Sequence, residues 1–355
     1  MFRKIIYAGI VVTLIAAFFM RNKLFLYFNA TKKSVNQTEV FFNFNANVGL
    51  EGLAHELKEK NIINNIEAFI SVGDYKGLDS NKLASGRYQI KPGTSYKDLL
   101  NGFTLNSNGN GNAEIEVNVT FNNCRDIEDL AGKVASSLMF DSTTLINYIY
   151  SNETLNKYGF TKAQIPSLFI PNTYKMFYDT DEKQFVERMA KEFKNFWTAD
   201  RKALLSKIGL NSPSQAVILA SIVYSEQSRN KEEWPIIAGL YLNRIKKGIR
   251  LQSDPTFKYC WGDELNGVQR LLAKHRDIDC PYNTYKINGL PPGPIYIPSS
   301  AVVDAVLHRA DVNYIYMCAK PDYTGLHNFA VSNAEHARNA KAFQTWLAAE
   351  LKKKG

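Results

Sequence analysis

One carboxylic acid, Glu226, follows an apolar segment in a way that could change its chemistry. The stretch at 212–228 reads SPSQAVILASIVYSEQS, and Ser212 is a residue type favoured at the start of a helix. The residues three, four and seven positions before Glu226 are Val223, Ile222 and Leu219. Glu226 therefore shares a helix face with core residues, and burial of a carboxyl raises its pKa. A carboxylic acid that stays protonated near neutral pH can serve as a general acid.

Spacing alone leaves a second interpretation of Glu226 open. A glutamate at the end of an apolar stripe is often paired with an arginine or lysine, and such structural pairs also perturb carboxylates. Metal chemistry has little support, because His327 and His336 lack an HExxH pattern or a third ligand at suitable spacing. We expect no cofactor.

Cys260 and Cys280 flank one segment of the chain. They could form a disulfide in an oxidising compartment or remain two free thiols, and the sequence leaves both alternatives open.

The pattern along the chain predicts an α+β protein. A small α+β unit is expected at 38–105, a flexible joint at 106–112, and a larger mixed α+β body at 113–355, which contains a loop-rich stretch at 250–297. Strands are expected at 39–43, 86–90, 113–120, 168–174 and 313–318. Helices are expected at 49–60, 66–75, 95–100, 127–139, 143–150, 185–197, 199–208, 212–228, 236–247, 299–308 and 334–353.

The chain of 355 residues carries a net charge of +9, which suits an anionic partner such as a membrane face or a cell-wall polymer. Nucleic acid is not supported, because the sequence shows no zinc-finger spacing, aromatic RNA-binding motif or basic helical run. Residues 5–20 form an apolar run without charge, and residues 24–28 extend it. A cleaved signal peptide is the rival, but the end of the run lacks small residues, so we predict an uncleaved anchor and tether at 1–30.

Several longer strings resemble one family, the MltG-type (YceG-like) endolytic murein transglycosylases. These strings are SIVYSEQ, LNRIKKGIRLQSDPT, PYNTYKINGLPPGPI, LFIPNTY and LHNFAVSNAEH. The resemblance covers nearly the whole chain, and RLQSDPT at 250–256 is long and uncommon. Two departures exist: Tyr224 stands where many members have the first Glu of EKET, and Asn172 where many have Asp in FPDTY.

The resemblance implies a single-pass protein of the cytoplasmic (inner) membrane with its body on the outer, periplasmic face. It implies a LysM-like subdomain, matched by GRYQIKPGTSYKDLL, and a catalytic domain that cuts peptidoglycan glycan strands internally. Peptidoglycan synthases are candidate partners. The catalytic residue of the family corresponds to Glu226. Residues expected to bind substrate are Gln227, Asn243, Gln252, Ser253, Asp254, Asn283, Thr284, Tyr285 and His327. For the neighbouring Arg244, contact with a helix end is more expected than contact with a peptide stem.

The reaction that the resemblance implies needs one carboxylate. Glu226 protonates the oxygen leaving from the bond between N-acetylmuramic acid and N-acetylglucosamine. The muramic 6-hydroxyl then closes on C1, with the ionised Glu226 as base, to give a 1,6-anhydro end. A lysozyme-like hydrolase is the first alternative, and it would need a second carboxylate about 5–9 Å away, for which Asp254 is the candidate. A non-catalytic peptidoglycan-binding scaffold is the second alternative.

Overall fold

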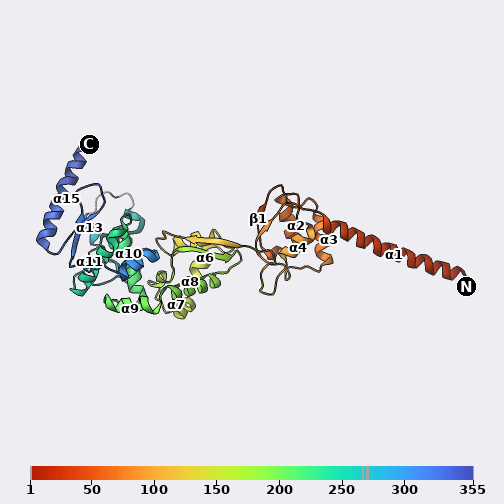
Figure 1. The fold of residues 1–355 in the computed structure, drawn as a ribbon, viewed down its shortest axis with the longest axis horizontal. Helices are drawn as coiled ribbons and strands as arrows, with labels where there is room; N and C mark the ends of the chain where they lie inside the picture. Colours follow the sequence, from red (N-terminus) through yellow and green to blue (C-terminus); the bar gives the residue numbers. More distant parts are fainter. Residues whose placement is uncertain (1, 266–267, 269–271, 355) are drawn as a thin grey trace. The chain divides into compact units, whose positions relative to one another are not determined.

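The computed structural model describes residues 2–265, 268 and 272–354 of the chain (Figure 1). It divides into two compact units. Unit 1 comprises Met1–Val119, Ser137–Met139 and Lys175–Thr180, and unit 2 comprises Thr120–Ser136, Phe140–Tyr174 and Asp181–Gly355. Helices and small antiparallel sheets occur together, so the predicted α+β class is confirmed.

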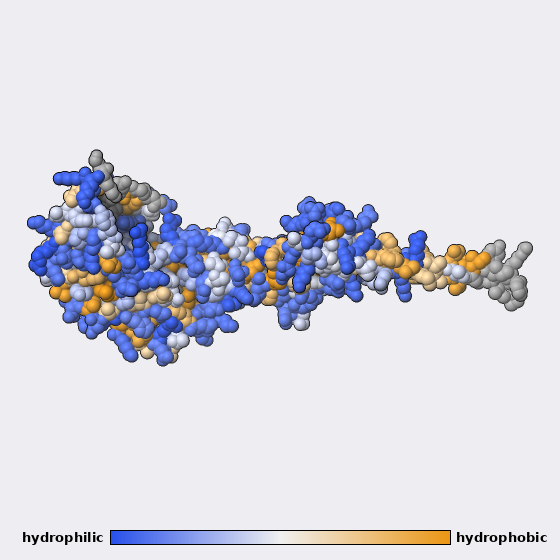
Figure 2. Space-filling view, turned by 45° about the horizontal axis from the view of Figure 1, so that its top comes forward, coloured by the Kyte–Doolittle hydropathy of each residue, from blue (hydrophilic) through white to orange (hydrophobic). Residues whose placement is uncertain are grey.

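Unit 1 begins with the long helix α1 (Phe2–Thr31), whose stretch Ile10–Thr31 is long and apolar enough to cross a membrane. Its side chains from residue 10 to residue 28 are mostly exposed, and Figure 2 shows the hydrophobic surface along it. Charged residues at 21 and 23 do not interrupt the helix, so it runs further than the apolar run at 5–20. Near its end Asn29 is buried, and its Nδ2 donates to Ser71 Oγ at 3.2 Å. The last turns of α1 thus belong to the folded unit.

In the rest of unit 1, helices pack against one antiparallel pair of strands. β1 and β2 are antiparallel, in register from Val40↔Ile90 to Phe44↔Gly86. Side chains from this pair and from the helices form an aromatic core that includes Phe42, Phe44, Phe69, Tyr96 and Phe103. The elements after α1 are β1 (Val40–Phe44), 3-10 helix η1 (Ala46–Val48), α2 (Gly49–Glu59), α3 (Ile66–Tyr75), β2 (Gly86–Ile90), α4 (Tyr96–Phe103) and β3 (Glu116–Phe121).

The segment expected as a flexible joint forms a tight loop inside unit 1. Leu105 bridges to Gly111 across it, and Glu114 then bridges back to Tyr88 on β2. Residues 113–119 therefore return to the first unit, which extends past residue 105. The likeness of residues 38–105 to LysM domains, and their binding of glycan, stay predictions.

β3 pairs with β4, and the residues of these two strands are divided between the two units. Unit 2 itself is mainly helical, and in it β5 pairs with β6 in the register Tyr316↔Ala330 to Ala319↔His327. Its elements are α5 (Ile127–Ala135), α6 (Ser142–Ile149), α7 (Asn152–Tyr158), η2 (Ile165–Leu168), β4 (Asn172–Phe177), α8 (Glu182–Phe196), α9 (Ala199–Lys207), α10 (Pro213–Glu226), η3 (Lys231–Glu233), α11 (Trp234–Lys246), α12 (Asp254–Trp261), η4 (Gly262–Leu265), α13 (Ala273–Arg276), α14 (Ser300–Leu307), β5 (Tyr316–Ala319), β6 (His327–Ala330) and α15 (Asn333–Lys354).

Helix α10 lies at the centre of the core of unit 2. Ser212 caps it by accepting a hydrogen bond from the backbone N–H of Gln215, as its residue type predicts. Every residue from 216 to 223 is buried, and the helix packs on α11, α12 and α14. The predicted core positions Leu219, Ile222 and Val223 are confirmed. This packing fixes the carboxyl end of α10, where Glu226 is the last helical residue.

The structure departs from expectation in three places in unit 2. Asp254–Trp261 is a helix, where the turn signal Asp254-Pro255 suggested a loop, because proline is equally well suited to the first turn of a helix. The strand β6 lies where no strand was expected, and the expected strand at 168–174 splits into η2 and β4. Cys260 and Cys280 are joined by a disulfide with Cα atoms 6.2 Å apart, which decides the alternative left open above.

Candidate active site

The carboxyl group of Glu226 receives two hydrogen bonds on one oxygen. Tyr241 Oη donates to Glu226 Oε1 at 2.7 Å, and Ser253 Oγ donates to the same atom at 2.5 Å. No residue that the structure describes donates to Oε2. Burial raises the pKa of Glu226; the two hydrogen bonds oppose the rise, and the nearby negative charge of Asp254 adds to it. The carboxyl therefore holds its proton more strongly than a free glutamate does, and Oε2 is left for another partner.

Two different elements bring the hydroxyl donors to Glu226. Tyr241 lies on α11, which packs beside α10, and its side chain is buried. Ser253 precedes α12 and is fully buried. The residue before it, Gln252, has a positive φ of 50°, a conformation that side chains other than glycine rarely adopt. This backbone turn aims Ser253 at the carboxyl.

The segment around Thr284 holds Ser253 in place. Thr284 Oγ1 accepts from the backbone N–H of Ser253 at 3.0 Å, and its carbonyl accepts from Gln252 N at 3.1 Å. Asn283 Nδ2 donates to the carbonyls of Arg276 and Ile278, each at 2.8 Å. Because Asn283 and Thr284 are fully buried, they act here on the protein itself.

Asp254 is close enough to influence Glu226, but it already has partners. Tyr285 Oη donates to Asp254 Oδ1 at 2.5 Å, and Arg276 lies 3.6 Å from Oδ2. The burial of Tyr285 and the charge of Asp254 both raise the pKa of this phenol, which stays protonated and a donor. Each oxygen of the one candidate second carboxylate is thus engaged by a neighbouring side chain.

Two side chains of helix α11 donate hydrogen bonds to backbone carbonyls of neighbouring segments. Arg244 is buried and donates to the carbonyls of Arg250 and Ile315 and to Gln252 Oε1. Asn243 Nδ2 donates to the carbonyls of Val312 and Tyr314. These contacts join α11 to the segment that leads into β5.

A buried glutamate that sequence reasoning missed, Glu233, lies beside the site. Its carboxylate accepts from His327 N and approaches His327 Nδ1, each at 2.8 Å, and accepts from Gln227 Nε2 at 2.9 Å. Gln227 Oε1 in turn accepts from the backbone N–H groups of Arg229 and Asn230. Gln227 is therefore occupied within the protein. Glu233 also holds His327 near Glu226, and a positive charge on His327 would lower the pKa of Glu226.

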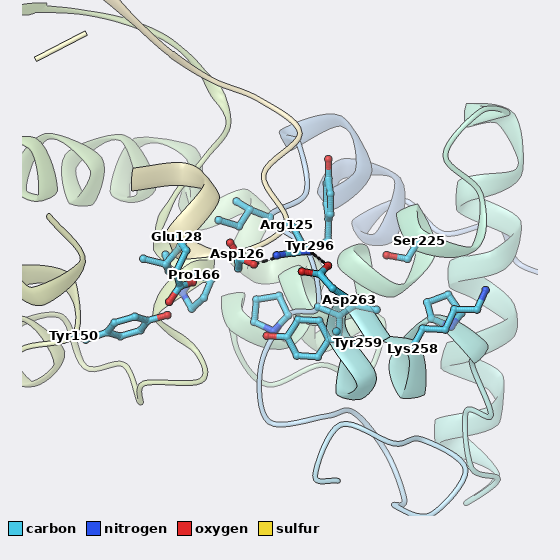
Figure 3. A pocket seen from close by; sticks show the side chains of 16 residues that line it. Arg125, Asp126, Glu128, Tyr150, Pro166, Ser225, Lys258, Tyr259, Asp263 and Tyr296 are labelled. Carbon is cyan, nitrogen blue, oxygen red and sulfur yellow. Dashed lines mark hydrogen bonds and ion pairs between the residues drawn. The ribbon is translucent and has the colours of Figure 1, made fainter. Parts of the chain in front are cut away.

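A pocket of about 740 Å³ opens beside the end of α10, and Ser225 and Pro255 line it next to the carboxyl site. Figure 3 shows aromatic and charged side chains around it, with Arg125 bonded to both Asp126 and Asp263. Tyr296 also lines it and stacks on Tyr224 with ring centroids 4.6 Å apart. Tyr224, the first of the two departures from the family pattern named above, is thus part of an aromatic stack.

Most of the predicted site residues come together in unit 2, in three roles. Glu226, Ser253, Asp254 and Tyr285 form the acid site and its charged neighbour. Gln227, Asn243, Asn283 and Thr284 hold backbone around it, and Gln252 Oε1 accepts from the side chain of Arg244. His327 is held by Glu233. Tyr241 and Glu233 were missed, although Tyr241 falls on a predicted helix and its hydroxyl is the signal that could have marked it. Direct contact of any of these residues with substrate stays a prediction.

The similarity to known proteins extends over most of the chain and is not confined to one motif. An endolytic murein transglycosylase of Bacillus subtilis is 27% identical over 302 residues, 80% of each chain. One of Streptococcus pneumoniae is 30% identical over 129 residues, 36% of this chain and 23% of that protein. The crystal structure of a YceG-like protein of Listeria monocytogenes has a TM-score of 0.53 at 22% identity, over 85% of this chain and 99% of that one, and shows the shared fold. Residues 42–342 match the YceG-like family, and the chain belongs to that family.

Proposed function

We propose that this protein is a peptidoglycan lytic transglycosylase that cuts glycan strands internally, with Glu226 as its acid and base. Its relatives are named endolytic murein transglycosylases. The observation that carries the proposal is the single carboxyl with a raised pKa, hydrogen-bonded through Oε1 alone. The residue before it, Ser225, lines the pocket of about 740 Å³.

The mechanism follows from the two unequal oxygens of Glu226. Ser253 and Tyr241 fix the carboxyl through Oε1, so the proton resides on Oε2 and is given to the oxygen that leaves C1 of N-acetylmuramic acid. An oxocarbenium-like state develops at C1, and the ionised carboxylate then takes the proton of the 6-hydroxyl as that oxygen bonds to C1. The two hydroxyl donors, which lower the pKa of Glu226, stabilise its ionised form at this stage.

The pocket beside Ser225 is where we place the neighbouring sugars of the strand. Tyr150, Tyr259 and Tyr296 line it and offer faces on which sugar rings can lie. Its charged side chains have both signs, since Arg125 is paired with Asp126 and Asp263 and Lys258 also lines the pocket. An internal cut needs substrate on both sides of the acid, and an open pocket allows a strand to continue past it. In the cell such cuts would terminate or trim nascent glycan strands.

Membrane attachment through α1 is part of the proposal. The apolar stretch Ile10–Thr31 suits either an anchor or a signal sequence. We favour the anchor, because the last turns of α1 pack against α3 and α4 in unit 1. Cleavage after residue 20 would leave only a short piece of α1 to make these contacts. The disulfide in unit 2 suits an oxidising compartment, which supports a body on the outer face of the cytoplasmic membrane. A native protein whose N-terminus begins after residue 20 would contradict this.

Analysis of the products tests the reaction. Purified sacculi digested with the protein should release fragments that end in 1,6-anhydro-N-acetylmuramic acid, which are lighter by one water than hydrolytic products. Mass spectrometry before and after borohydride reduction separates the two, because only reducing ends gain hydrogen.

The hydrolase alternative rests on Asp254, whose charge acts on Glu226. Reducing ends from the wild-type protein would favour it and keep Glu226 as the acid. The absence of any released fragment, with strands still bound, would instead favour a non-catalytic scaffold.

A further inference from the structure

A second pocket, of about 400 Å³, lies in unit 1 where the apolar helix meets the folded domain. Its walls come from the end of α1, the end of α3 and the start of α4. Leu26, Ala30 and Val72 give it an apolar part. Three lysines and two tyrosines also line it: Lys23, Tyr27, Tyr75, Lys76 and Lys97. This pocket is remote in sequence from every residue of the acid site.

The charge of this pocket is one-sided. Lys23, Lys76 and Lys97 are exposed, and none forms an ion pair with a residue that the structure describes. No carboxylate lines the pocket; Asp98, next to Lys97, accepts a hydrogen bond from Ser95 Oγ. Three ammonium groups around a partly apolar hollow are complementary to a group that is anionic at one end and apolar at the other.

The position of the pocket along α1 places it at a bilayer surface. The apolar stretch Ile10–Thr31 does not lie in a bilayer along its whole length, because Asn29 near its end is buried in unit 1. We therefore take residues 5 to 22 as the span; these eighteen residues cover about 27 Å at the rise of 1.5 Å per residue, close to the thickness of a hydrocarbon core. Lys23 then lies at the edge of the core, and the turns that follow lie among lipid headgroups. Phe25, Phe28 and Tyr75 are exposed there at 58%, 64% and 72%, in the manner of an aromatic interfacial belt.

We propose that this pocket binds the headgroup of an anionic phospholipid of the bilayer that α1 spans. The phosphate lies among the three ammonium groups, the tyrosine hydroxyls donate to it, and the acyl chains stay in the bilayer beside the exposed apolar side chains of α1. The site would fix the rotation of α1 and the height of unit 1 above the membrane. It rests on the proposed anchoring, and it is independent of the cut at Glu226.

Native mass spectrometry of the full-length protein tests the site. The protein is released from nanodiscs that contain equal amounts of phosphatidylglycerol and phosphatidylcholine, and retained lipid is counted. The wild type should retain phosphatidylglycerol in preference. The double variant Lys76→Gln/Lys97→Gln should lose roughly tenfold to thirtyfold in affinity for it. The matched control Lys60→Gln/Lys91→Gln, which removes the same charge from exposed lysines outside the pocket, should retain the wild-type affinity.

Three results would overturn the lipid site: equal retention of the two lipids, an equal loss in the control variant, or full displacement of the lipid by millimolar inorganic phosphate. The last would mean a site for a soluble anion. The intact mass from the same experiment reports whether residues 1–20 are present, and so tests the anchor separately. Cutting of sacculi in detergent should be unchanged in Lys76→Gln/Lys97→Gln, and Glu226→Gln should retain lipid normally, so failure of one proposal leaves the other testable.

Discussion

Helices α1 and α10 are both apolar on every face, yet they meet opposite surroundings. Residues 216–223 of α10 are buried without exception, whereas the side chains of α1 from 10 to 20 are exposed. A helix that is hydrophobic all round is either a core helix or a membrane span. The charged residues near their ends also differ: Glu226 is half-buried and has a raised pKa, while Lys23 is exposed. The same apolar pattern thus accompanies a raised carboxyl pKa in α10 and an exposed hydrophobic surface in α1.

The largest effect is expected where α10 ends. Glu226→Gln should lower the rate of cutting by roughly 10⁴-fold or more, because proton transfer by one positioned group is worth about 10²–10⁴ and this group serves two steps. The release of fragments from sacculi measures it. Glu232→Gln, which changes an exposed glutamate nearby, is the matched control and should cut normally. Strong residual cutting by Glu226→Gln would move the acid role to another carboxylate, with Asp254 first in line.

The same truncation in the two helices should separate their environments. Leu219→Ala in α10 removes a fully buried side chain and should lower the free energy of unfolding by about 2–5 kcal/mol. Leu14→Ala in α1, where the side chain is 64% exposed, should change it by less than about 0.5 kcal/mol. Denaturant unfolding of the full-length protein in detergent measures both. Similar losses would show that α1 is packed against protein rather than surrounded by lipid.

The buried acid should also cost stability at neutral pH. The pKa of Glu226 is raised in the folded state, so its contribution is fully present below the unfolded value of about 4.3 and is lost as the pH rises through the folded value. As the pH rises through this window, the midpoint temperature of thermal unfolding should therefore fall for the wild type relative to Glu226→Gln. Parallel curves for the two proteins would contradict the raised pKa.

The smallest effect concerns the two hydroxyls that oppose the rise in pKa. Ser253→Ala or Tyr241→Phe removes one hydrogen bond that lowers the pKa of Glu226, so this pKa should rise further. Because Glu226 must be protonated to act as acid, the basic limb of the pH–rate profile should move to higher pH. Ser228→Ala, which changes an exposed serine nearby, should leave the limb in place. A shift to lower pH would mean that the limb belongs to another group.

Local patterns predicted much of the fold. α3 and β2 have the bounds expected from periodicity and turn residues, and Gly248 follows α11 with a φ of 67°, as a helix-ending glycine does. The helix α12 was missed because Asp254-Pro255 suits both a turn and a first helical turn. β6 was missed because four residues carry too little alternation to stand out. Short elements in loop-rich stretches depend on partners that are distant in sequence.

The amino-acid sequence by itself determined that Glu226 ends an apolar helix, since helical spacing places it on the same face as Leu219, Ile222 and Val223. Only the tertiary structure decided which side chains complete the site. Tyr241, Ser253 and Asp254 come near Glu226 through the packing of α11 and α12. Glu233 accepts from Gln227 and contacts His327, which lies 94 positions further along the chain than Glu233. Helical periodicity acts over a few residues, whereas the contacts that set the pKa of a buried acid depend on which helices pack together.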